Sequence, residues 1–379
     1  MKRWKVYNGI DRVETAKSFL QGRRLGLLTS ASGINRSGIP TSEILSEYGH
    51  LSYLFSPEHG LYANLQDGLY GKDSWDPETG AAICDAGLLA NPDDARVRAI
   101  FENLDTAVYD IQDVGARFYT YLYNLTDLMQ CCQRYGKPLI VLDRINPIGG
   151  VRMDGAILDV AHFSSGIGRY AIPTRYAMTS GELARFVNAE GKIGCDLTVI
   201  PCEGWRRDVF YDETDLPWVN PSPNIPSVGT ALNYIGSCIF EATNVSEGRG
   251  TTRPFDMVGA PFVDVPAFYR EMTDHQLPGV VFRKAYFTPG FQKYAGQTCG
   301  GLEMLITDRE AYDPIRTMLY MLAHLRRYEA FTCRPDGFAI RFGTNLLADP
   351  NYDTEKFCAE AAEANRAFHK KAEPYWLYA

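Results

Sequence analysis

The sequence lacks the cysteine, membrane and leader patterns that would fix its class at once. Its nine cysteines are odd in number and none stands in a C-x-x-C spacing, so we expect reduced thiols rather than a disulfide framework or a zinc site. No stretch approaches the ~20 apolar residues of a membrane span. Residues 1–7 are not followed by the apolar core of a signal peptide. We therefore expect a cytoplasmic protein with no membrane span.

Motifs for phosphate binding and nucleophilic catalysis are also missing. There is no Walker loop, no G-x-S-x-G turn and no H-E-x-x-H helix. The G-x-G-x-x-A match at 166–171 lies far from the first expected strand, where a dinucleotide-binding motif belongs. The formal net charge of −8 argues against a nucleic-acid partner, which would need a basic face. A few local arginines can still bind a small anion.

What is present is the composition of a large globular protein. Hydrophobic residues make up 45% and charged residues 22% of the 379, so a sizeable core forms without disulfides. A chain of this length suggests two domains. The prolines between Pro217 and Pro226 oppose regular structure, and we place the boundary there. Residues 1–226 then form the first domain and residues 227–379 the second.

Short apolar runs alternate with amphipathic segments in the first domain. This alternation predicts an α/β fold with a parallel sheet and helices on both faces. Its strands are expected at 24–29, 51–56, 106–111, 138–142 and 197–201, and its helices at 11–21, 41–48, 92–104, 117–135 and 180–190. The second domain is expected to be α+β, with strands at 279–287 and 301–307 and helices at 229–243, 310–328 and 353–372.

Acidic side chains follow three of the expected strands. Ligands of parallel sheets bind beyond the carboxyl ends of the strands, so we expect one crevice there. The irregular segment 61–79 is expected to lie over it, because long loops at strand ends are often functional. The residues expected around the crevice are Ser30, Glu58, Asp110, Asp113, Asp143, Arg144 and Glu203.

Each strand end has a functional and a structural interpretation. Glu58, on a turn with His59, is either an active-site acid or a helix cap or arginine partner. Arg144 either clamps a carboxylate bidentately or forms a structural pair with Asp113 or Asp143.

The aromatic and glycine-rich segments are open to two interpretations as well. Tyr119, Tyr121 and Asn124, on a helix opened by Arg117, either line a sugar site or pack in the core. The run Glu247–Thr251 either brings its backbone close to a ligand or forms a plain loop with a surface ion pair.

Together these motifs resemble the DUF1343 family, whose characterised members are exo-β-N-acetylmuramidases of the NamZ type. The resemblance covers nearly the whole chain in order. The matching runs are Ser56–Gly60, Tyr109–Tyr121, Leu142–Pro147, Met178–Ala184, Pro221–Pro226, Glu247–Thr251, Phe287–Pro289, Lys293–Gly296 and Cys299–Gly301.

The resemblance implies a Rossmann-like first domain, a smaller α+β second domain and no metal or cofactor. It implies removal of terminal β-linked N-acetylmuramic acid from peptidoglycan fragments, with Glu58 as the acid. The substrate is then a small anionic amino sugar or muropeptide. The sequence departs from the usual family pattern at Ser30–Gly33, at Leu61–Ala63 and at Tyr176, which bears on the substrate more than on the reaction.

The resulting hypothesis is an exo-acting glycosidase. Glu58 protonates the leaving oxygen, His59 or Asp113 tunes it, and Asp110 or Asp113 is the second carboxylate. Arg117, Arg144 or Arg249 binds the lactyl carboxylate. The remaining residues expected to bind substrate are Tyr119, Tyr121, Asn124, Asp143, Asn146, Asn224 and Glu247. The alternatives are a non-catalytic protein that binds sugars or peptidoglycan fragments, and a nucleotide-dependent α/β transferase.

Overall fold

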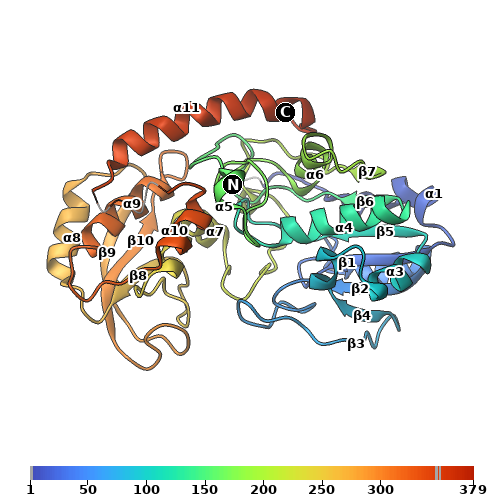
Figure 1. Ribbon diagram of the computed structural model, residues 1–379, viewed down its shortest axis with the longest axis horizontal. Coiled ribbons are helices and arrows are strands. Elements are labelled where there is room, and N and C mark those ends of the chain that lie inside the picture. Colours follow the sequence, from blue (N-terminus) through green and yellow to red (C-terminus); the bar gives the residue numbers. More distant parts are fainter. Residues whose placement is uncertain (1–2, 346–348, 350) are drawn as a thin grey trace.

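The computed structural model describes residues 3–345, 349 and 351–379. Seven strands form the larger sheet, in the order β3-β4-β2-β1-β5-β6-β7 (Figure 1). All neighbours run parallel except β3 and β4, so the carboxyl ends of six strands meet at one edge. The strands are β1 Arg24–Thr29, β2 His50–Ser56, β3 Ser74–Trp75, β4 Ala82–Asp85, β5 Thr106–Asp110, β6 Leu139–Leu142 and β7 Leu197–Ile200.

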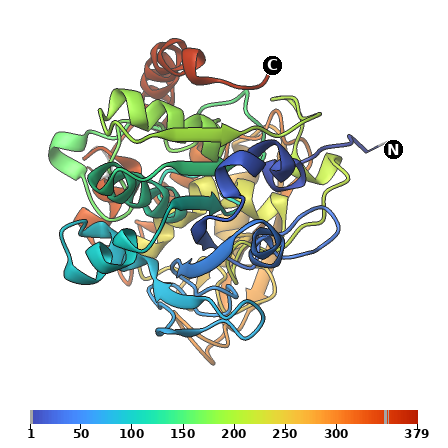
Figure 2. The same cartoon turned by 90° about the vertical axis from the view of Figure 1, so that its right-hand side faces the viewer.

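Helices cover both faces of this sheet, which confirms the predicted α/β fold. Alternate strand residues enter two separate cores: Leu27 and Leu54 lie in one, and Leu28 and Phe55 in the other. Figure 2 shows α3 and α4 on one side of the strands and the N-terminal helices on the other. The helices of this part of the chain are η1 Gly9–Ala16, α1 Lys17–Leu20, α2 Thr41–Tyr48, η2 Ala86–Ala90, α3 Ala95–Glu102, α4 Tyr121–Tyr135, α5 Val160–Phe163 and α6 Ser180–Glu190.

The second part of the chain is the predicted α+β unit, built on an antiparallel sheet of order β8-β10-β9. Gly301 of β10 lies so close to β8 that a Cβ would stand 2.1 Å from the Val258 carbonyl oxygen, which only glycine permits. The strands are β8 Met257–Ala260, β9 Val280–Phe287 and β10 Cys299–Ile306. The helices are η4 Cys238–Ala242, η6 Glu373–Tyr375, α7 Val228–Ser237, α8 Val265–Asp274, α9 Pro314–Leu325, α10 Pro335–Phe342 and α11 Thr354–Ala372, with η3 Tyr211–Glu213 before them. The boundary between residues 226 and 227 stays a prediction.

One expected helix starts later than its sequence pattern indicates. The prediction of 117–135 is wrong at its start, because α4 begins at Tyr121. Gly115 has a φ of +80°, and the Arg117 N–H donates to the Thr174 carbonyl at 2.8 Å instead of continuing a helix. The segment before α4 is therefore a loop fixed by contacts with residues much later in the chain.

The last helix ties the two parts together. α11 passes over both in Figure 1, and the residues after it return to the larger sheet. The Tyr378 hydroxyl donates to Asp143 Oδ2 at 2.5 Å, and the Leu377 N–H donates to Glu182 at 2.8 Å. The tail thus contacts the carboxyl end of β6. Among the described residues no helix is long and apolar enough to cross a membrane.

Candidate active site

Glu58 lies on the turn that follows β2, as the sequence predicts. The turn requires left-handed backbone at both His59 (φ +74°) and Gly60 (φ +81°). Two donors fix the carboxylate: the Thr120 hydroxyl binds Oε2 and the Gly68 N–H binds Oε1, each at 2.7 Å. Thr120 precedes the first residue of α4, so Glu58 lies close to the N-terminus of that helix.

The polar segment after the turn folds back over Glu58. The His59 N–H donates to the Leu69 carbonyl at 3.0 Å, and the His59 Nδ1 lies 2.9 Å from the Leu65 carbonyl oxygen. His59 is buried and holds this loop through both its backbone and its ring. These contacts with Leu65 and Leu69 indicate that His59 positions the loop.

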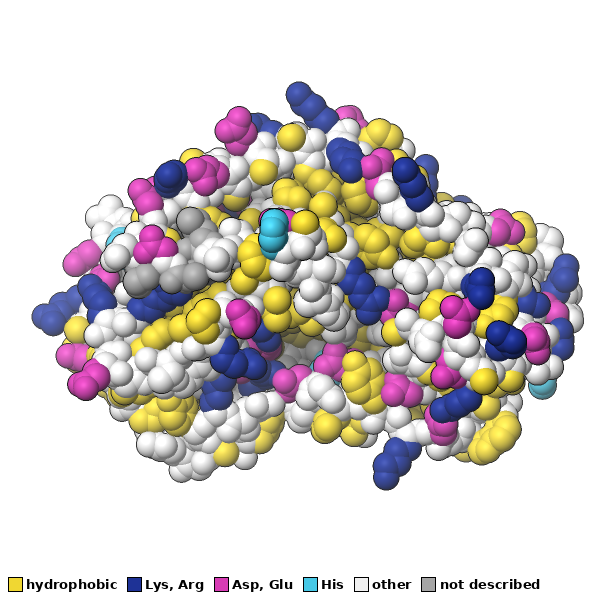
Figure 3. Space-filling model, viewed as in Figure 1, with side chains coloured by type: hydrophobic (Ala, Val, Ile, Leu, Met, Phe, Trp, Pro, Cys, Tyr) yellow, Lys and Arg dark blue, Asp and Glu magenta, His cyan; other side chains and the backbone are white. Residues whose placement is uncertain are grey.

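A cavity of about 180 Å³ opens beside Glu58 at the junction of the two sheets. Figure 3 shows a hollow between the two halves of the molecule with acidic and basic side chains at its edge. Its charged lining residues are Glu58, Asp67, Glu241, Arg249 and Arg341, and its aromatic ones include Phe118, Tyr119, Tyr234 and Phe255. A sugar presents apolar ring faces and polar rims, and this combination of side chains suits it.

Arg249 is the hub of the charged groups in the cavity. Its guanidinium lies 2.8 Å from Asp67, 3.2 Å from Glu241 and 2.6 Å from Glu247. Burial works to lower the pKa of Arg249, but these three carboxylates outweigh burial and raise it. Arg341 binds the other oxygen of Glu241 at 2.6 Å. Glu241 is thereby fixed by two arginines inside the cavity.

The structure brings together only some of the residues predicted for the site, so the expectation of one crevice is wrong. Those that line the cavity with Glu58 are His59, Tyr119, Asn224 and Arg249. The others that the sequence suggested do not line it, although Tyr121 contacts Glu58 and His59 from behind and Glu247 pairs with Arg249. They are Ser30, Asp110, Asp113, Arg117, Tyr121, Asn124, Asp143, Arg144, Asn146, Glu203 and Glu247.

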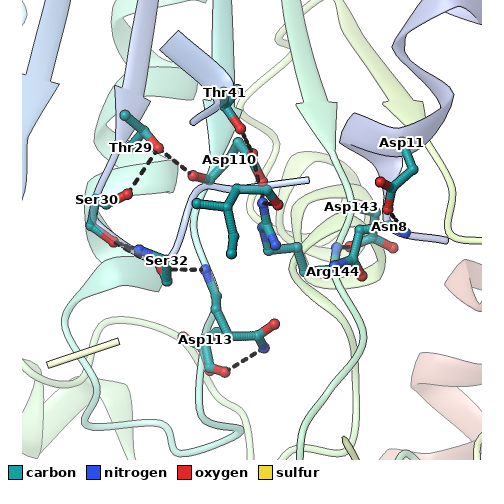
Figure 4. A network of polar contacts seen from close by, with 12 residues as sticks. Asn8, Asp11, Thr29, Ser30, Ser32, Thr41, Asp110, Asp113, Asp143 and Arg144 are labelled. Carbon is teal, nitrogen blue, oxygen red and sulfur yellow. Dashed lines mark hydrogen bonds and ion pairs between the residues drawn. The ribbon is translucent and has the colours of Figure 1, made fainter. Parts of the chain in front are cut away.

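Asp110 and Arg144 form a buried ion pair under the edge of the sheet (Figure 4). Arg144 Nη2 lies 2.8 Å from Asp110 Oδ2, its Nε binds Oδ1, and Thr41 adds a third donor. Both side chains are almost fully inaccessible. Arg144 thus forms a structural ion pair, as one of its two interpretations predicts, but the partner is Asp110 and not Asp113 or Asp143.

Arg117 is also internal. It is fully buried and donates to the carbonyl oxygens of Ala156, Ile172 and Arg341 at 2.6–2.8 Å. Burial lowers its pKa to about 10. The bond to Arg341 joins the first part of the chain to α10, and Arg117 does not line the Glu58 cavity.

Several of the other predicted residues serve packing or internal hydrogen bonds. Tyr121 is buried and donates to the Pro221 carbonyl at 2.6 Å, and the Asn146 amide donates to the Met178 carbonyl at 2.9 Å. Glu247 is buried between Arg249 and Lys293. The Glu247–Arg249 pair is therefore an interior pair, not the surface pair considered from sequence. Asn124 is buried with its Oδ1 unbonded, and Glu203 is exposed beside Arg12.

Asp113 gives a pH-dependent prediction. Burial raises its pKa to about 6, although Tyr176 and the Gly115 N–H donate to its Oδ1. A carboxyl with a raised pKa stabilises the fold fully below the unfolded pKa, and this contribution is lost as the pH rises through the folded pKa. Asn cannot ionise, so the stability of Asp113→Asn relative to wild type should rise between about pH 4 and about pH 8. The expected rise in unfolding free energy is up to about 3 kcal/mol, and it appears as a higher Tm of the variant relative to wild type.

The matched control for this experiment is Asp105→Asn. Hydrogen bonds from Arg24 lower the pKa of Asp105 to about 2. Its stabilisation is complete above the unfolded pKa, so the Tm offset of this variant should stay constant from about pH 5 to about pH 8. A pH-independent offset for Asp113→Asn in scanning calorimetry would contradict a raised pKa at that position.

Among the cavity residues that sequence reasoning missed are Asp67, Tyr234, Glu241 and Arg341. Tyr234 lies on α7, and Cys238 and Glu241 lie on η4, which continues it. Their spacing of i, i+4, i+7, read as a helical pattern in the sequence, is a signal that could have pointed to them. Asp67 lies in the loop that was expected to cover the site. Arg341 lies on α10, which was not expected as a helix.

A larger cavity of about 870 Å³ lies beside α11 and shares no lining residue with the Glu58 cavity. Its lining includes Arg175, Arg366 and Lys370, and its acids are the exposed Asp208 and Glu310. It offers no fixed pair of carboxylates. The chemistry therefore points to the smaller cavity. Among the described residues no group of three His, Cys, Asp or Glu side chains is placed to hold a metal.

Known proteins match this chain along most of its length. Residues 25–229 match the family described as exo-beta-N-acetylmuramidase NamZ, N-terminal, and residues 232–378 match its C-terminal counterpart. The peptidoglycan beta-N-acetylmuramidase NamZ of Bacillus subtilis (strain 168) is 40% identical over 325 residues, which are 85% of this chain and 77% of the relative.

Two solved structures have the same fold. Both are crystal structures of DUF1343 family proteins from Bacteroides fragilis NCTC 9343. One superposes with a TM-score of 0.88 at 26% identity and covers 100% of both chains. The other has a TM-score of 0.80 at 28% identity and covers 99% of both chains.

Proposed function

The chain belongs to the exo-beta-N-acetylmuramidase NamZ family, and on that premise we propose that the Glu58 cavity hydrolyses terminal β-linked N-acetylmuramic acid from peptidoglycan fragments. The observation that carries the proposal is the position of Glu58. Its carboxylate is held by two donors at the wall of a cavity that also contains a second fixed carboxylate and an arginine. These are the groups that a glycosidase acting on an acidic sugar needs.

Glu58 serves as the general acid. It donates a proton to the glycosidic oxygen as the bond from that oxygen to the anomeric carbon breaks. Before a sugar binds, Thr120 and Gly68 hold the two carboxyl oxygens in one orientation. Asp110 cannot share this work, because Arg144 occupies both of its oxygens under the sheet.

Glu241 is the second carboxylate that we propose for the reaction, in place of Asp110 or Asp113. Its side chain is 17% exposed in the cavity and pairs with Arg249 and Arg341, which orient it. An ionised carboxylate at this position stabilises the positive charge that develops on the sugar ring, or takes a proton from the attacking water.

Arg249 is the residue proposed to bind the lactyl carboxylate, the group that distinguishes muramic acid from N-acetylglucosamine. Of the three arginines suggested by the sequence, it alone lines the cavity. Arginine binds a carboxylate with two parallel N–H donors, a geometry that lysine cannot supply. Tyr119 and Tyr234 provide the apolar surface beside it.

The direct test uses two disaccharides that differ in their non-reducing sugar. The protein should release free N-acetylmuramic acid from the one that begins with that sugar and nothing from the one that begins with N-acetylglucosamine. Tight binding without release would favour the alternative of a sugar-binding protein. Products cut from within longer glycan strands would contradict an exo-acting enzyme.

Glu241→Gln should lower kcat for the muramic-acid disaccharide by about 10²-fold, because the amide keeps the shape but loses the charge that stabilises the transition state. Steady-state kinetics measure the loss. Glu271→Gln on α8 is the matched control, since Glu271 pairs with Arg327 away from the cavity. Unchanged kcat in Glu241→Gln would remove Glu241 from the mechanism.

A further inference from the structure

The proposed lactyl-binding arginine already holds a carboxylate from its own chain. Asp67 Oδ2 lies 2.8 Å from Arg249 Nη1, on the loop that covers Glu58. Within the described part of the chain, one other side chain bonds to Asp67: the Gln292 amide donates to its Oδ1 at 2.6 Å. Asp67 therefore bridges the first part of the chain to two residues of the second, across the mouth of the cavity.

The three acids around Arg249 are not equivalent. Glu247 is 1% exposed and also binds Lys293, and Glu241 is 17% exposed and also binds Arg341. The side chain of Asp67 is 42% exposed and has no second cation in the described part of the chain. Ion pairs that face water are worth little, because solvent screens them. Of the three carboxylates, that of Asp67 is the one that another carboxylate can replace.

We propose that Asp67 occupies the place on Arg249 that the lactyl carboxylate of the substrate takes on binding. This inference rests on the proposed function. The exchange keeps the number of carboxylates paired with Arg249 constant, because that of Asp67 leaves as that of the substrate binds. A sugar without the lactyl group has no carboxylate that could replace that of Asp67 on Arg249, so Asp67 stays in place. Asp67 is thus a positioning residue that contributes to specificity.

The exchange also reaches Glu58 through the chain itself. Gly68 directly follows Asp67, and its N–H is the donor to Glu58 Oε1. Movement of Asp67 away from Arg249 therefore moves this donor as well. The Oε1 atom then becomes free to approach the glycosidic oxygen. Recognition of the lactyl carboxylate and exposure of the acid become one event.

The test compares wild type, Asp67→Asn and Asp73→Asn. Asp73 is the matched control, because it belongs to the same segment but pairs with Arg96 at the surface. The quantities measured are KM for a muramic-acid β-glycoside and the competitive Ki values of N-acetylmuramic acid and N-acetylglucosamine. Asp67→Asn should lower KM and the N-acetylmuramic acid Ki roughly two- to fivefold, since the competitor on Arg249 is weakened. The N-acetylglucosamine Ki should not change.

Two results would overturn the proposal: unchanged constants, or a rise for both sugars, which is the signature of a loop that only supports the site. A crystal structure with N-acetylmuramic acid gives an independent measurement. The lactyl carboxylate should lie on Arg249 with Asp67 displaced, and Asp67 still on Arg249 would contradict the exchange. Failure of the wild type to hydrolyse the muramic-acid glycoside would instead count against the proposed function.

Discussion

Glu58→Gln lowers the turnover of a muramic-acid disaccharide by about 10²–10⁴-fold, the range that a positioned general acid contributes. The sugar leaving group departs as a poor alkoxide unless its oxygen is protonated. A 4-nitrophenyl glycoside of the same sugar leaves without that help, so the variant should lose far less activity on it. The ratio of the two losses identifies the acid, because damage elsewhere in the site would affect both substrates alike.

The control for this experiment is Glu78→Gln, an exposed glutamate from the same irregular segment. It should turn over both substrates as the wild type does. In Glu58→Gln, the new amide side chain can still bond to Thr120 and Gly68, so the fold of the turn should persist. An unchanged Tm of that variant checks this. Wild-type rates for Glu58→Gln on the disaccharide would exclude Glu58 as the acid.

The largest expected loss of stability follows from Asp110→Ala. Its partner Arg144 would keep its charge in the interior with only carbonyl acceptors left, such as that of Ile34 at 2.8 Å. Removing one member of a buried ion pair costs about 3–5 kcal/mol, because the remaining charge is neither paired nor hydrated. Urea unfolding at neutral pH measures this loss as a lower midpoint.

The double variant Asp110→Ala/Arg144→Met separates pairing from packing. Removing both charges should recover most of the lost free energy, since no uncompensated charge remains. Arg144→Met alone should be destabilising as well, because it leaves the Asp110 carboxylate with Thr41 as its remaining side-chain donor. Losses that simply add in the double variant would show that the pair is not the cause. A stable Asp110→Ala protein without turnover would return Asp110 to the candidate catalytic residues.

The sequence predicts five of the seven strands of the larger sheet and the position of Glu58, because both depend on local order. It misses β3, β4 and β8. Apolar runs such as Leu25–Leu28 leave few alternatives to a buried strand, and residues after such a strand lie at its carboxyl end. The same rule does not say whether a side chain there points into a cavity or into the protein. Asp110 and Asp143 point inward, where Arg144, Thr179 and Tyr378 meet them.

The remainder of the cavity depends on contacts between distant segments, which no local pattern encodes. Glu241 and Arg341 come from helices of the second part and face Glu58 only because the two sheets are placed side by side. Arg117 is the opposite case, a residue expected at the site that contacts between distant segments place in the interior. It stands among residues with a functional spacing, yet its Nη1 and Nη2 groups donate to carbonyl oxygens from three separate segments.

The bond between Tyr378 and Asp143 has a consequence for how the protein is made. The two residues are 235 positions apart, so a ribosome finishes Asp143 roughly 10–50 s before it reaches Tyr378. During that interval the carboxyl end of β6 lacks the phenol that covers it. The larger sheet, whose strands are synthesised first, is thus completed late, and a nonsense codon that removes Tyr378 would leave Asp143 at the end of β6 without this donor.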